Sequence, residues 1–272
     1  MKQGIIVVNH GTSDFEVRRN TIEELVLSIG DRYEDADIAS AYTDGEVRRK
    51  LREISGEKIQ NVKATILSMK ERGVTHLSVI TTDIIEDADH KRIREDVSAL
   101  AGIFKDVRIT KPLIADTKDS NLVARAFYSA FSDIVGDDHM VVIACDDRTV
   151  YEDQEPDFFM DEVFDKPLES LENSLREFIK NSYVASVSGK RKLYKVIKEI
   201  NSINDGNKKR IVLVPLEFIA GADIENEVSR KLPELVDRLR EEDYDVDVIF
   251  KGLGEYDAFQ RLYLKHLYDE MY

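Results

Sequence analysis

Five side chains that can bind a transition metal occur at or shortly after the ends of apolar runs: His10, Asp89, His90, Cys145 and Asp223. Imidazole, thiolate and carboxylate groups all bind divalent metals of this class. His10 shows the pattern most clearly, because it follows the run Gly4–Asn9 and precedes a Gly-Thr turn. Ligands of α/β folds bind at the carboxyl ends of strands, so these positions are candidates for a site.

Each of these residues also has an ordinary structural interpretation. A histidine before Gly-Thr is often a turn residue, and an aspartate near a helix start is a common cap. A cysteine at a strand end is most often a small buried residue. The spacings do not form a zinc-binding motif. The residues alone therefore leave both metal binding and a structural role open.

The sequence lacks the motifs of several other chemistries. It contains no phosphate loop of the form GxxxxGK, no GxGxxG and no GxSxG element. The segment "GLGE" (Gly252–Glu255) follows a predicted strand but has no third glycine. Nucleotide binding at a glycine-rich loop and hydrolysis at a serine elbow are therefore not expected.

The composition is that of an acidic globular protein. The chain has 272 residues, 42% hydrophobic and 34% charged, with a net charge of −15. This charge argues against a nucleic-acid partner, while a local basic patch would still allow an anionic small ligand. No apolar run is long enough to span a membrane, and the run after Lys2 is too short for a signal peptide. We therefore expect a cytoplasmic protein without membrane association. Cys145 is the only cysteine, which excludes an intrachain disulfide. The sequence is compatible with a homo-oligomer.

Strand and helix patterns alternate along the chain, which predicts an α/β fold with mostly parallel sheets flanked by helices. The expected strands are Gly4–Asn9, Ala36–Tyr42, His76–Thr81, Asp106–Thr110, His139–Cys145, Tyr183–Val187, Arg210–Leu216 and Asp245–Phe250. The expected helices include Phe15–Asp31, Ile59–Arg72, Ala88–Ala101, Asn121–Ile134 and Glu225–Glu241. Asp119 and Ser120 are expected to cap the fourth of these helices.

The chain shows signs of an internal duplication. "GIIVVNHGTSD" parallels "HMVVIACDDRT", and "HLSVITTDIIEDADHKRIRED" parallels "IVLVPLEFIAGADIENEVSRK". Cys145 is the counterpart of His10 and Asp223 that of Asp89, at nearly equal offsets close to half the length. We therefore predict two similar α/β lobes, residues 1–135 and 136–272, with a cleft between them and a C-terminal helix that can pack back on the first lobe.

Several segments resemble, in order and spacing, the anaerobic, ATP-independent cobalt chelatases that insert Co²⁺ into sirohydrochlorin in cobalamin synthesis. They are "VVNHGTSDFEVRRNTIEEL", "AYTDGEVRRKLRE", "ERGVTHLSVITTDIIEDADHKRI" and, most similar, "FKGLGEYDAFQRLYLKHL". The resemblance covers most of the chain and is weakest in the acidic segment Tyr151–Ser170. It implies two α/β lobes around a tetrapyrrole cleft.

The resemblance also implies a metal site, from which this sequence departs. The family uses two histidines in the C-terminal half, and here those positions match Cys145 and Asp223. A carboxylate survives at Asp89. One interpretation is a relocated metal site at His10 with Asp89 or His90, assisted by Asp223 and Cys145, in which His10, Asp89 and Asp223 are catalytic. The alternative is a non-catalytic tetrapyrrole- or metal-binding relative.

The implied substrates are a divalent metal and an anionic tetrapyrrole. Co²⁺ is the expected metal, with Ni²⁺ or Fe²⁺ as alternatives, and no further cofactor is expected. The tetrapyrrole carries many carboxylates, which arginine binds through its bidentate fork. The expected contacts come from the segment after His10 and, as a second choice, from a basic cluster: Thr12, Ser13, Arg18 and Arg19, then Arg48, Arg49, Lys50 and Arg52.

Overall fold

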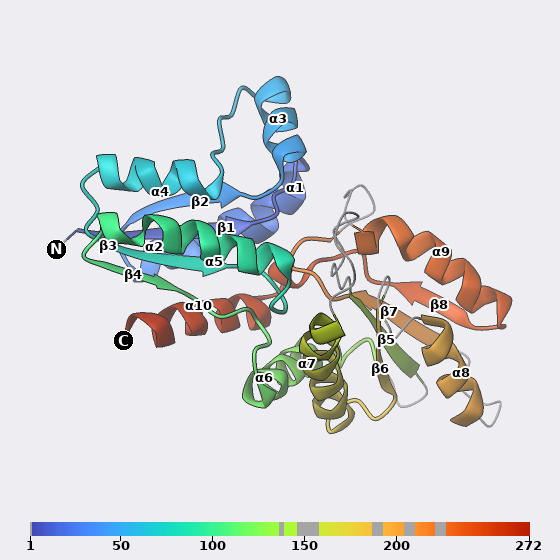
Figure 1. Cartoon of the computed structure of the whole chain (residues 1–272). Helices are drawn as coiled ribbons and strands as arrows, with labels where there is room; N and C mark the ends of the chain where they lie inside the picture. The colour runs from blue at the N-terminus through green and yellow to red at the C-terminus, as the bar shows by residue number, and fades with distance from the viewer. Residues whose placement is uncertain (1, 136–138, 146–157, 187–192, 204–209, 221–226) are drawn as a thin grey trace. The chain divides into compact units, whose positions relative to one another are not determined.

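The computed structural model describes residues 2–135, 139–145, 158–186, 193–203, 210–220 and 227–272 (Figure 1). The chain forms two compact units, which are described separately. Unit 1 comprises Met1–Leu113 with Gln260–Tyr272, and unit 2 comprises Ile114–Phe259. These limits differ from the predicted lobes 1–135 and 136–272, because helix α6 (Thr117–Phe131) groups with unit 2 and the C-terminal segment with unit 1.

Unit 1 is built on a four-stranded parallel sheet in the order β2-β1-β3-β4. Its strands are β1 (Gln3–Asn9), β2 (Asp37–Tyr42), β3 (His76–Thr81) and β4 (Asp106–Ile109). One face forms a core with helices α4 (Val62–Glu71) and α5 (Ala88–Leu100), in which Ile6 and Val8 are fully buried. This alternation puts Ile5, Val7 and Asn9 on the other face. The carboxyl ends of β1, β2 and β3 lie together at one edge of the sheet.

Unit 2 repeats this topology, with a parallel sheet in the order β6-β5-β7-β8. Its strands are β5 (His139–Cys145), β6 (Ser182–Ser186), β7 (Arg210–Pro215) and β8 (Asp245–Val248). The described helices are α6, α7 (Phe158–Arg176), α8 (Leu193–Ile203) and α9 (Glu227–Glu241). The predicted fold class, two similar lobes with parallel sheets flanked by helices, is therefore confirmed. β5 occupies the position of β1, and β7 that of β3, as the sequence parallels predicted.

Two helix predictions need correction in their details. The helix predicted at Asn121–Ile134 begins at Thr117, because the carboxylate of Asp116 accepts a hydrogen bond from the Asp119 amide at 2.9 Å and forms the N-cap. Asp119 and Ser120 lie in its first turns, so their prediction as caps was wrong. The helix predicted at Phe15–Asp31 is interrupted by a π-helical turn, which lies between α1 and α2. The bounds are α1 (Phe15–Arg18), η1 (Arg19–Glu23) and α2 (Glu24–Arg32).

The acidic segment Tyr151–Ser170 is described in its second part only, where α7 begins at Phe158. Residues 151–157 lie outside the described part of the chain. In that described part, no helix combines the length and the apolar character needed to cross a membrane.

Gly252 in the segment "KGLGE" is held against the backbone that follows β7. The amide of Leu253 donates to the carbonyl of Glu217 at 2.8 Å, and the amide of Gly254 donates to that of Phe218 at 2.9 Å. A Cβ atom on Gly252 would lie 2.4 Å from the Phe218 carbonyl oxygen and 2.6 Å from the Ala220 nitrogen. Only glycine fits here without a backbone shift.

We therefore expect Gly252→Ala to lower the free energy of unfolding by about 3 kcal/mol, the upper range for overpacking a well-packed site. Urea unfolding followed by circular dichroism measures this loss. Gly102→Ala is the control, because a Cβ atom at Gly102 meets nothing within 4 Å. Equal unfolding midpoints for the two variants would contradict the packing argument.

Candidate active site

His10 lies directly after β1 and pairs with Asp44, which lies two residues after the end of β2. The His10 Nε2 atom is 3.0 Å from Asp44 Oδ2. Asp44 is also the N-cap of helix α3 (Gly45–Ile54), where its Oδ1 accepts hydrogen bonds from the amides of Glu46 at 2.6 Å and Val47 at 3.2 Å. The Asp44 amide in turn donates to the His10 carbonyl at 3.2 Å. Backbone and side-chain bonds thus fix the two residues together.

The charge state of Asp44 decides what His10 can do. The hydrogen bond from the His10 ring holds the pKa of Asp44 well below its usual range, against the opposing effect of burial. The carboxylate is therefore ionised at neutral pH and accepts the Nε2 proton of His10. In the neutral imidazole Nδ1 then carries the lone pair, and among the described residues this atom has no hydrogen-bond partner. The His10 side chain is 36% exposed, so this nitrogen can serve as a metal ligand or a base.

The turn after His10 depends on glycine. Gly11 has φ = +96°, and a Cβ atom there would lie 2.5 Å from the ring of the buried Tyr42. Thr12 is buried and its Oγ1 accepts a hydrogen bond from the Asp14 amide at 3.1 Å, while Ser13 is half-buried. Thr12, predicted to bind substrate, therefore already uses its hydroxyl to shape the turn.

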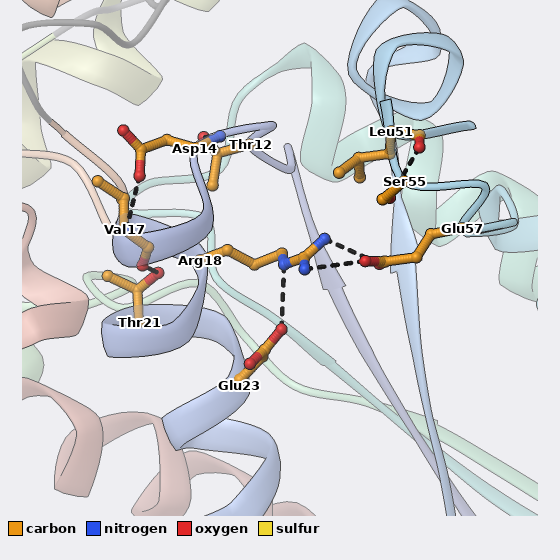
Figure 2. A network of polar contacts seen from close by, with 9 residues as sticks. All are labelled: Thr12, Asp14, Val17, Arg18, Thr21, Glu23, Leu51, Ser55 and Glu57. Carbon is orange, nitrogen blue, oxygen red and sulfur yellow. Dashed lines mark hydrogen bonds and ion pairs between the residues drawn. The ribbon is translucent and has the colours of Figure 1, made fainter. Parts of the chain in front are cut away.

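Arg18 and Arg19 are adjacent but differ in what they contact. Arg18 is 7% exposed and forms a bidentate ion pair with Glu57, at 2.8 Å and 3.0 Å, while its Nε lies 3.0 Å from Glu23 (Figure 2). Its guanidinium group is thus directed at two carboxylates of the chain itself. Arg19 is exposed and, among the described residues, forms no ion pair. Of the two, Arg19 is the more accessible to an external anion.

Asp89 and His90 lie in the first turn of α5, after the end of β3. His90 is 2% exposed, and its Nδ1 lies 2.9 Å from Asp83 Oδ2. Asp89 is half-buried and lies 3.6 Å from Arg92, one turn further along the helix. The N-cap is Asp87, which accepts a hydrogen bond from the His90 amide at 2.7 Å. The structure thus pairs His10 with Asp44 and His90 with Asp83.

Burial and a neighbouring carboxylate both disfavour the ionisation of Asp87. Burial, followed by the charge of Asp83, raises the pKa of Asp87 to about 7. Tyr263 of helix α10 (Asp257–Met271) donates a hydrogen bond to the Thr82 carbonyl at 3.0 Å, which holds the segment just before Asp83.

Within the described residues, no three histidine, cysteine or acidic side chains are close enough to hold a metal ion.

We expect Asp87→Asn to flatten the pH dependence of stability. Below pH 4 the Asp87 carboxyl is protonated in the folded and the unfolded chain alike. From there to about pH 7 the folded state binds more protons than the unfolded state, so this group lowers the unfolding free energy by up to about 1.4 kcal/mol per pH unit. Asparagine caps a helix as well as aspartate and does not ionise. The variant should therefore match the parent near pH 4 and exceed it in stability at pH 8.

Urea unfolding at several pH values between 4 and 8 checks this expectation. Asp116→Asn, at the N-cap of α6, controls for the change of capping residue. An unchanged slope of stability against pH in Asp87→Asn would show that Asp87 does not resist ionisation.

Of the two candidate metal ligands in the second half of the chain, the structure describes Cys145 but not Asp223. Cys145 ends β5, is 2% exposed and donates its thiol hydrogen to the Ala185 carbonyl, with Sγ 3.4 Å from that oxygen. Asp223 lies outside the described residues. The grouping of His10, Asp89, Cys145 and Asp223 in one site stays a prediction.

Asp44 is a residue that the sequence analysis did not single out. A signal was available, because parallel pairing of β1 with β2 sets Asn9 beside Tyr42, and the residues after both strands then meet. The carboxylate of Asp44 follows β2 in the segment "AYTDGE". A search of neighbouring strand ends for partners of His10 would have found it.

A family model described as "Cobalt chelatase (CbiK)" matches residues 3–272, almost the whole chain. The chain belongs to the cobalt chelatase family. A curated sirohydrochlorin cobaltochelatase from Salmonella typhimurium is 24% identical over 119 residues, which are 44% of this chain and 45% of that protein. The matched segment thus spans less than half of either protein.

Solved structures of chelatases share the fold. SirB from Bacillus subtilis with Fe³⁺ superposes with a TM-score of 0.67 at 16% identity, over 99% of this chain and 96% of that one. The sirohydrochlorin chelatase SirB from Bacillus subtilis subspecies spizizenii in complex with cobalt gives 0.65 at 14% identity, over 99% and 95%. These matches confirm the fold expected for a cobalt chelatase, and the family is one of metal chelatases.

Proposed function

We propose that this chain inserts a divalent metal, Co²⁺ first among them, into sirohydrochlorin or a similar anionic tetrapyrrole without ATP, in cobalamin synthesis. The observation that carries the proposal is the pairing of His10 with Asp44 at the carboxyl end of β1, in a chain of the cobalt chelatase family. Metal and tetrapyrrole are both substrates in this proposal, and no further cofactor is invoked.

The chemistry of metal insertion fits an oriented imidazole. As the metal forms bonds to the four ring nitrogens, the macrocycle loses two pyrrole protons and the ion loses its water ligands. A neutral imidazole can hold the hydrated metal loosely or accept a pyrrole proton, because its ordinary pKa lies near 6.5. Asp44 keeps Nε2 protonated, which leaves Nδ1 of His10 for either task and stabilises the imidazolium after proton transfer.

Exposed cations on the elements that follow His10 and Asp44 are proposed to bind the carboxylates of the tetrapyrrole. Arg19 and Arg52 are exposed, and neither forms an ion pair with a described residue. Arg48 is turned back toward its own helix, where its Nε donates to the Asp44 carbonyl at 3.2 Å. We therefore place Arg19 and Arg52 first among the candidates. Binding by Ser13, metal contacts from Asp89 and Asp223, a cytoplasmic location and a homo-oligomer stay predictions.

The direct test is spectrophotometric. Sirohydrochlorin is incubated anaerobically with Co²⁺, Ni²⁺ or Fe²⁺, and the absorption spectrum of the macrocycle is followed with and without the protein. We expect a rate above the uncatalysed background, highest with Co²⁺. No acceleration with any of these metals, for protein shown to be folded, would refute the proposal.

A second candidate function is a non-catalytic tetrapyrrole- or metal-binding protein. The observation that favours it is Cys145, which stands where the resemblance leads one to expect a histidine. Its thiol is buried and donates a hydrogen bond to the Ala185 carbonyl. Titration of the protein with sirohydrochlorin and with Co²⁺ tests this function. Binding without acceleration of metal insertion would support it, and failure to bind either would exclude it.

A further inference from the structure

Helix α3 is held to unit 1 by polar contacts more than by apolar packing. Leu51 is its only residue buried in the described structure, and Ile54 at its end is 75% exposed. Figure 1 shows α3 outside the helix layers that cover the sheet. A helix with one buried side chain is free to tilt and slide unless other contacts fix it. Its orientation matters, because Asp44 at its N-terminus contacts His10.

The C-terminal end of α3 is fixed by an ion pair. Gly56, with φ = +75°, follows the helix, and the Ser55 hydroxyl donates to the Leu51 carbonyl at 2.9 Å (Figure 2). The next residue is Glu57, which is the bidentate partner of Arg18. Ten helical residues span about 15 Å, so Arg18 acts on the far end of the helix from Asp44.

Arg18 is a rigid anchor for this end. It is 7% exposed, its Nε lies 3.0 Å from Glu23, and its guanidinium carbon lies 5.8 Å from the centre of the Phe15 ring. A bidentate arginine–carboxylate pair fixes direction as well as distance. The pair contributes little net stability, because Glu57 is 40% exposed and solvent screens its charge. The main effect of the Arg18–Glu57 pair is therefore to orient the C-terminal end of α3.

We propose that Arg18 and Glu57 are positioning residues for the imidazole of His10. By fixing the far end of α3, the pair keeps Asp44 at the near end against His10 Nε2, which presents Nδ1 to the metal or the pyrrole proton. The effect on metal insertion rests on the proposed function, whereas the effect on the His10–Asp44 hydrogen bond does not.

The experiment compares Glu57→Gln with Glu199→Gln. Glutamine keeps the size of the side chain and removes its charge. Glu199 is a matched control in unit 2, because Arg176 pairs with it at 3.0 Å and with Glu172 at 2.9 Å, one arginine between two glutamates. The first readout is the proton resonance of the hydrogen-bonded His10 Nε2–H. The second is backbone amide hydrogen exchange in α3 relative to α4.

In Glu57→Gln we expect the His10 Nε2–H resonance to broaden or disappear through exchange with water, and exchange in α3 to accelerate at least several-fold. The parent and Glu199→Gln should retain both signatures. An unchanged His10 resonance in Glu57→Gln, or an equal change in Glu199→Gln, would overturn the proposal. If the parent inserts metal, Glu57→Gln should lower kcat while the control does not. If the parent has no activity but Glu57→Gln still loses the resonance, the proposed function is refuted and the positioning role stands.

Discussion

His10→Ala is expected to lower the rate of metal insertion by about 10²- to 10⁴-fold, the range for losing a positioned acid–base group. Among the described residues, His10 is the only histidine at the carboxyl ends of the unit 1 strands that both pairs with an ionised carboxylate and is partly exposed. The variant removes this imidazole. Asp44 would keep its helix-capping bonds to Glu46 and Val47, so the fold should persist. The rate with Co²⁺ and sirohydrochlorin, followed in the absorption spectrum, measures the effect.

Two further variants make this prediction specific. His76→Ala removes a half-buried histidine at the opposite, amino-terminal end of β3, and should keep the parental rate. Asp44→Asn keeps an effective N-cap but weakens the bond to His10, and should show an intermediate loss. A His10→Ala variant as fast as His76→Ala would exclude His10 from the chemistry.

Gly11→Ala is expected to lower the free energy of unfolding by about 3 kcal/mol or more, through two separate costs. A side chain at φ = +96° costs about 1 to 2 kcal/mol in backbone strain. The new methyl group would also lie 2.5 Å from the ring of Tyr42, which is buried and must move. Urea unfolding at neutral pH measures the sum.

Gly73→Ala separates these two costs. Gly73 has φ = +84°, and a Cβ atom there meets nothing within 4 Å, so this variant carries the backbone strain without the collision. We expect it to lose about 1 to 2 kcal/mol, clearly less than Gly11→Ala. Equal losses in the two variants would show that the Tyr42 ring moves aside at no cost in free energy.

The central strands of the two sheets could be predicted from the sequence because they are buried on both faces. β1 and β5 appear as unbroken apolar runs, which is typical of parallel strands covered by helices. Helix starts were harder to predict, since several neighbouring residues can act as caps. Asp116 caps α6, although Asp119 and Ser120 also have suitable side chains, and only the backbone geometry distinguishes them.

The candidate site could be predicted in part. The position of His10 follows from the end of an apolar run, but its partner Asp44 comes from another strand and depends on the pairing of β1 with β2. Arg18 and His90 have side chains that suit both a ligand and an internal ion pair. Burial and the positions of Glu57 and Asp83 decide what they contact, and neither is visible in the sequence.

The shared strand order of the two sheets gives each unit an equivalent strand tip, at the end of β1 and at the end of β5. The same backbone position carries different side chains in the two units. The tip of β5 ends in the buried Cys145, whereas the tip of β1 is followed by the partly exposed His10. A repeated topology therefore does not make the two halves chemically alike, and a single reactive side chain is enough to distinguish them.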